Sequence, residues 1–95
     1  MNDLKCPEID YEKYAEILKA LGHPVRLKIA AGVMCNKCSV NDIVAHLLLP
    51  QSTVSQHLGV LRHAGILYPE KHGVSVCYRI SNQKAADIIK ILTAN

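Results

Sequence analysis

The chain has 95 residues, of which 49% are hydrophobic and 20% charged, and this length predicts a single soluble domain over residues 1–95. Four Tyr are present and Phe and Trp are absent, so we expect an aliphatic core and no base-stacking platform for single-stranded RNA. The formal charge of +3 is compatible with binding to duplex DNA but does not require it. The apolar runs are too short to span a bilayer and the N-terminal residues lack the apolar core of a signal peptide, which together indicate a cytoplasmic protein with no membrane partner.

Two helices are predicted in the first third of the chain, after an arm over residues 1–9 that we expect to be flexible. Asp10 can cap the first helix, whose apolar stripe includes Leu18 and which runs to about Leu21. A Gly-His-Pro break follows. Because proline fits the first turn of a helix, Pro24 predicts the start of a second helix that ends near Met34.

A helix-turn-helix is predicted over residues 39–64. Ser39 and its polar neighbours can cap a third helix, and residues 48–50 form a short turn. The fourth helix, 51–64, carries apolar residues at i, i+4 and i+7, the spacing of a buried face: Val54, Leu58 and Leu61. Gly65 follows it, where a left-handed residue ends a helix at low cost.

A β-hairpin, the wing, is predicted over residues 66–80, with strands at 66–70 and 74–80. In the second strand Val76, Tyr78 and Ile80 alternate with Ser75, Cys77 and Arg79. Ser81 or Asn82 can cap a last helix whose apolar residues extend to Leu92. The element order therefore predicts a mainly α fold with a small β-hairpin, a winged helix-turn-helix of about five helices plus the wing.

Candidate DNA contacts lie on the fourth helix and the wing. Small or uncharged hydrogen-bonding side chains approach base edges and phosphates closely, and basic groups at a hairpin contact phosphate or the minor groove. The candidates are Gln51, Ser52, Thr53, Ser55, Gln56 and Arg62 on the helix, and Lys71, His72 and Arg79 on the wing. The alternative interpretation is a solvated helix face and ordinary edge-strand charge. Within this frame we favour double-stranded DNA as the partner.

Segments along nearly the whole chain resemble the ArsR/SmtB family of bacterial repressors. They are residues 20–29 (ALGHPVRLKI), 40–43, 51–58 (QSTVSQHL), 61–66 and the wing residues Gly73 and 78–80. The resemblance implies a homodimer joined through the first and last helices, which binds a palindromic operator and leaves it when an inducer binds. Two positions depart from the family pattern: Leu48 stands where Gly is common in the turn, and Pro50 replaces the usual capping Ser.

The metal sites of that family do not carry over to this chain. Ser39 and Asn41 stand where one family site has its Cys-x-Cys pair. A second family site needs Asp, His and Glu on the last helix, where this chain offers only Asp87 and no His.

The remaining sensing candidates are thiols. Cys35 and Cys38 are one helical turn apart, Cys6 lies on the N-terminal arm, and Cys77 is better interpreted as a small apolar side chain of the wing. Two inducers fit such thiols: As(III) or a soft divalent metal ion held by thiolates, which we favour, or an oxidant or persulfide that links Cys35 to Cys38, or to Cys6. We expect no required cofactor.

Enzyme functions find little support in the sequence. A Cys-x-x-Cys in a redox enzyme normally follows a strand and opens a helix, whereas Cys35 follows a helix. No nucleophile–His–acid set or carboxylate pair indicates a hydrolase. We therefore expect a regulator, with an interaction module that does not sense ligands as a further alternative.

Overall fold

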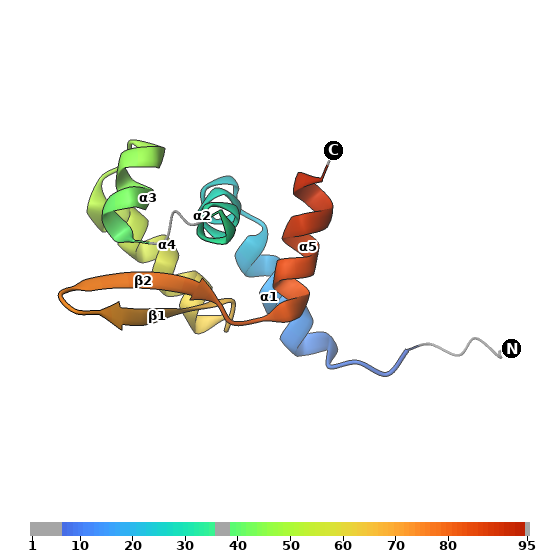
Figure 1. The fold of residues 1–95 in the computed structure, drawn as a ribbon. Coiled ribbons are helices and arrows are strands. Elements are labelled where there is room, and N and C mark those ends of the chain that lie inside the picture. The colour runs from blue at the N-terminus through green and yellow to red at the C-terminus, as the bar shows by residue number, and fades with distance from the viewer. Residues whose placement is uncertain (1–6, 36–38, 95) are drawn as a thin grey trace, which may run out of the picture.

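The computed structural model describes residues 7–35 and 39–94, and this part of the chain holds five helices and one antiparallel hairpin (Figure 1). In chain order they are α1 (Tyr11–Leu21), α2 (Pro24–Met34), α3 (Val40–Leu47), α4 (Gln51–His63), β1 (Leu67–His72), β2 (Ser75–Ile80) and α5 (Gln83–Thr93). Helices α3 and α4 lie at one end, α1 and α5 at the other, and α2 stands between them. The predicted mainly α fold class with a wing is confirmed.

Polar side chains cap most of the helices at their N-termini. Asp10 accepts a hydrogen bond from the Lys13 N–H at 3.1 Å, as predicted, and Ser39 and Asn82 cap α3 and α5 in the same way at 3.0 Å. His23 caps α2 through Nδ1, which accepts from the Val25 N–H at 3.1 Å. That cap was not predicted, because His is not among the residues usually expected at this position.

The end of α4 is a tight motif that also fixes the base of the wing. Gly65 adopts φ 77°, and the Ile66 N–H donates to the Leu61 carbonyl at 3.0 Å while the Gly65 N–H donates to the Arg62 carbonyl at 3.0 Å. This is a Schellman motif, in which a left-handed glycine lets the last carbonyls of a helix find donors. The Ser81 hydroxyl then donates to the Gly65 carbonyl at 2.9 Å, so both ends of the wing are attached to α4.

The turn between α3 and α4 places a leucine in a left-handed backbone conformation. Leu48 has φ 57° and its side chain is 87% exposed, while its N–H donates to the Val44 carbonyl at 2.8 Å. Left-handed φ is costly for residues that carry a Cβ, which explains why Gly is common at this position of the family.

The wing strands pair from Leu67 opposite Ile80 to His72 opposite Ser75, so β1 begins one residue later and ends two residues later than the predicted strand 66–70. Lys71 and His72 therefore belong to the strand, and Gly73 and Val74 form the tip. Cys77 is the buried residue of β2, and its backbone pairs with Ser39 at the start of α3.

The core contains aliphatic side chains from every helix and the base of the wing. Its largest fully buried members are Ile17, Ile29, Val54, Leu61, Ile66, Leu67 and Ile89. Leu18 and Leu92, which extend the apolar stripes of α1 and α5, are exposed because no described element packs over them. Among the described residues, no helix is both long and apolar enough to cross a membrane.

Candidate nucleic-acid interface

Helix α4 presents its polar residues away from the core. Val54, Leu58 and Leu61 are buried, whereas the predicted contacts on the first two turns are outside: Gln51, Ser52, Ser55 and Gln56 are exposed and Thr53 is half-buried. Within the described part of the chain these side chains make no hydrogen bonds, so their donors and acceptors face solvent. The arrangement suits contact with the edges of bases in a major groove.

The N-terminus of α4 differs from those of the other helices. Pro50 occupies the capping position and supplies no side-chain hydrogen bond. The first N–H groups of a helix lack partners within the helix and attract anions such as phosphate. Helix α4 thus begins with unpaired backbone donors beside Gln51 and Ser52.

The wing carries basic side chains that are paired with a carboxylate. His72 Nε2 lies 2.8 Å from Glu70 Oε1, and Arg79 Nε lies 3.5 Å from the same oxygen. Lys71 is exposed, as is Arg62 near the end of α4. All four groups predicted to contact the DNA backbone are therefore at the surface or close to it.

Glu70 belongs to the candidate interface through its contacts with His72 and Arg79, and the sequence did not predict it. In the observed register Glu70 lies opposite Cys77, so Arg79 is its diagonal neighbour on the adjacent strand. The sequence could have indicated the contact between Glu70 and Arg79 only through the pairing of the two strands, and only if the register had been predicted correctly. Glu70 Oε1 therefore contacts both His72 and Arg79, and the carboxylate partly neutralises the charge of Arg79.

Two histidines meet where α4 packs against the start of α2. The rings of His23 and His57 lie 4.7 Å apart between centroids and are tilted by 43°. Burial lowers the pKa of His57 from its ordinary value, and the nearby charges of His23 and Arg26 lower it further. His57 therefore favours its neutral form in the folded chain.

Of the predicted sensing cysteines, only Cys35 lies within the described residues; Cys6 and Cys38 lie outside them. Cys35 ends α2 as its C-cap and is free and exposed. Cys77 is 9% exposed and disulfide-bonded, and its bond partner is not Cys35 because Cys35 is free. Over residues 7–35 and 39–94, no group of three or more His, Cys, Asp or Glu side chains is placed to hold a metal ion.

Two helices joined by a tight turn, an exposed polar face on the second helix and an adjoining basic hairpin define a winged helix-turn-helix DNA-binding protein. A family model described as bacterial regulatory protein, arsR family, matches residues 23–68. The chain belongs to the ArsR family, whose members regulate transcription and are not enzymes.

Relatives of known name align over most of this chain. The transcriptional repressor PagR of Bacillus anthracis is 42% identical over 95% of this chain and 91% of the relative, and its crystal structure matches with a TM-score of 0.81 over 87% and 95% of the two chains. A structure of HlyU from Vibrio cholerae, named a transcriptional activator, matches with a TM-score of 0.83 at 32% identity over 90% and 94%; HlyU is also solved in a form described as reduced. The cadmium metal-sensor CMTR from Mycobacterium tuberculosis matches at 0.72 and 30% identity over 85% and 84%.

Proposed function

We propose that this protein represses transcription by binding double-stranded operator DNA as a homodimer and that it releases the DNA when its thiols react with an inducer. The observation that carries the DNA-binding part is the exposed face of α4, whose uncharged polar side chains have no partners among the described residues. The likeness to PagR, which is named a repressor, favours repression over activation.

The proposed DNA contacts are of two kinds, those to base edges and those to phosphates. Ser55 and Gln56 are exposed on the second turn of α4, where they can hydrogen-bond to base edges. Arg62 and Lys71 stand outside that turn and supply sequence-independent attraction to phosphates. The uncapped start of α4 adds backbone N–H donors for a phosphate.

The proposed dimer surface is the apolar face shared by α1 and α5. A depression between these helices is lined mainly by apolar side chains, together with Lys84 and Asp87: Ile9, Tyr14, Ile17, Leu18, Ile88 and Ile91. Leu92 is exposed on α5 as well. A small domain gains stability by burying such a face, and a two-fold pairing presents two α4 helices to the two halves of a palindrome.

A gel-shift titration with DNA from the region upstream of the protein's own gene tests the readout. We expect Ser55→Ala together with Gln56→Ala to weaken binding by at least about tenfold, since a good base contact contributes about 1–3 kcal/mol. The matched control is Gln83→Ala, because Gln83 is an exposed glutamine at the start of α5, away from α4. Unchanged affinity in the double variant would exclude α4 as the recognition helix.

For the inducer we propose As(III) or a soft divalent metal ion, which the fully reduced protein holds by the thiolates of Cys35 and Cys38, with Cys6 as a further ligand. Thiolates are the donors that soft cations prefer, and Cys35 is free and exposed at the end of α2. The similarity to a protein described as a cadmium sensor supports this choice.

The second candidate is a redox switch, and the disulfide-bonded state of Cys77 favours it. Two thiols reduce one peroxide: an S–S bond forms, the O–O bond breaks, and the thiol protons leave in two water molecules. This candidate differs from the first in its inducer and leaves the DNA-binding proposal unchanged.

Titration of the operator complex with arsenite, Cd(II), peroxide and polysulfide separates the two candidates. We expect arsenite or Cd(II) to release the DNA from the wild type, and Cys35→Ser with Cys38→Ser to abolish that release. Release by peroxide alone, lost in Cys77→Ser, would support the redox switch instead. Release by arsenite or Cd(II) that survives the double serine variant would refute the metal-binding role of the pair.

A further inference from the structure

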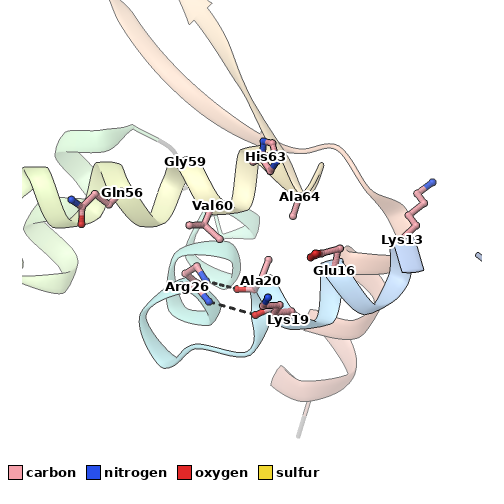
Figure 2. Close-up of a pocket in the computed structure, with 10 residues that line it drawn as sticks. All are labelled: Lys13, Glu16, Lys19, Ala20, Arg26, Gln56, Gly59, Val60, His63 and Ala64. Atoms are coloured by element: carbon pink, nitrogen blue, oxygen red, sulfur yellow. Dashed lines mark hydrogen bonds between the residues drawn. The ribbon is translucent and has the colours of Figure 1, made fainter. Parts of the chain in front are cut away.

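A cavity of about 670 Å³ lies between α1, the start of α2 and α4, and of the proposed DNA contacts and the described cysteines only Gln56 lines it (Figure 2). Its volume is within the range of sites that hold small organic molecules. Its floor is made of small or apolar residues, namely Ala20, Gly59, Val60 and Ala64, and Val60 is 42% exposed there. The space exists because three of these four side chains are no larger than a methyl group.

The rim of this cavity is mostly cationic. Lys13, Lys19 and Arg26 line it, His63 stands on the α4 side, and Glu16 is the one carboxylate among the described residues that line it. Arg26 is held in place: its Nε donates to the Ala20 carbonyl at 2.6 Å and its Nη2 to the Lys19 carbonyl at 3.4 Å (Figure 2). A guanidinium anchored in this way keeps further N–H groups for an anion and loses little freedom on binding it.

The cavity is on a different face of α1 from the proposed dimer surface. Lys13, Glu16 and Ala20 follow one another at spacings of three and four residues and form one stripe, whereas Tyr14 and Leu18 belong to another. A second copy seated on the α1–α5 face therefore leaves the cavity open. On its other wall, the cavity shares Gln56 with the proposed DNA-reading surface.

We propose that this cavity binds a small organic anion with an apolar body, and that the bound anion weakens operator binding. The acidic group lies at Arg26 and Lys19, and the apolar body covers Val60 between α1 and α4. Anion binding at this site does not depend on the proposed function, but its effect on DNA does. The regulation is separate from the thiols, because no cysteine lines the cavity among the described residues.

The test uses 8-anilinonaphthalene-1-sulfonate as the anionic probe and the uncharged N-phenyl-1-naphthylamine as its control. Binding is followed by fluorescence and located by NMR amide shifts. We expect the sulfonate to bind, with shifts at Gly59 and Ala64, and Arg26→Gln and Lys19→Gln each to weaken it about tenfold through loss of a charged hydrogen bond. Lys28→Gln, an exposed change on α2 outside the cavity, is the matched control.

Gly59→Leu blocks the cavity without removing any charge. A Cβ at Gly59 meets nothing within 4 Å, and leucine is a better helix former than glycine, so this variant folds while its side chain fills the space. We expect it to abolish sulfonate binding, and we expect the probe to lower operator affinity in the wild type but not in Gly59→Leu.

Four outcomes contradict the proposal, three of them as a whole and one in its regulatory part. Equal binding of the uncharged analogue, or shifts confined to the α1–α5 face, shows that the probe senses only exposed apolar surface. If the wild type does not bind the sulfonate specifically and Arg26→Gln and Lys19→Gln lose operator affinity, the two cations contact DNA phosphates instead. Specific binding with unchanged operator affinity refutes the regulatory part alone.

Discussion

Replacing Leu48 by glycine is expected to stabilise the protein. A residue with a Cβ loses about 1–2 kcal/mol in the left-handed region, and glycine adopts it freely. Against this gain, glycine adds about 0.4–1 kcal/mol of conformational entropy to the unfolded chain. The leucine side chain is 87% exposed, so its removal costs little burial.

The net gain is about 0.5–1 kcal/mol, which corresponds to about 2–8 °C in Tm for a domain of this length. Urea denaturation and thermal melting measure this gain at one fixed protein concentration, because the stability of the proposed dimer would depend on concentration.

Leu48→Ala is the decisive control. It removes the same exposed side chain but keeps the Cβ, so the backbone cost persists and we expect no gain. If Leu48→Ala stabilises the protein as much as Leu48→Gly does, the gain comes from removing exposed apolar surface, and the reasoning from φ 57° is wrong.

Three further predictions concern the core, the wing and the histidine pair. Leu61→Ala, at a fully buried position, should lower the free energy of unfolding, measured by urea denaturation, by about 2–5 kcal/mol. Val60→Ala, on the outer face of α4, should change it by under about 1 kcal/mol. Equal effects of the two variants would contradict the packing described. Glu70→Gln should tighten operator binding about two- to fivefold in anisotropy titrations, because it frees Arg79 to contact a phosphate. The affinity should also fall more steeply as the salt concentration rises. Weaker binding by this variant would mean that the ion pairs hold the wing in its binding geometry. Folding lowers the pKa of His57, so on acidification the unfolded chain takes up a proton before the folded chain does. The free energy of unfolding should therefore be full above the ordinary pKa of 6.5 and decline as the pH falls below it. His57→Gln should flatten this decline, and an unaltered slope in urea titrations at several pH values would refute the assignment of the decline to His57.

The helices could be predicted from the sequence because their signals are local. Asp10, Ser39 and Asn82 each satisfy a backbone N–H within three residues of their own position, and Gly65 ends α4 within the same short range. Such signals need no knowledge of the rest of the fold.

The features that the sequence did not predict depend on contacts between different elements of the fold. Glu70 meets Arg79 only in the observed register, and the cationic cavity brings together residues from α1, α2 and α4 that are separated along the chain. The disulfide bond of Cys77, which the sequence analysis interpreted as a small apolar side chain, was not predicted either. Interactions of this kind depend on tertiary packing, which the pattern of apolar residues along one helix or strand does not contain.

The contact between Ser39 and Cys77 has a mechanical consequence when it is combined with the joint at Gly65. The start of α3 is tied to β2, and β2 returns through Ser81 to the end of α4, so α3, α4 and the wing form a closed ring of contacts. A closed ring resists bending between its parts. In the dimer that we propose, an inducer would therefore meet the least resistance by turning the whole ring relative to the second copy, and this turn would change the distance between the two recognition helices.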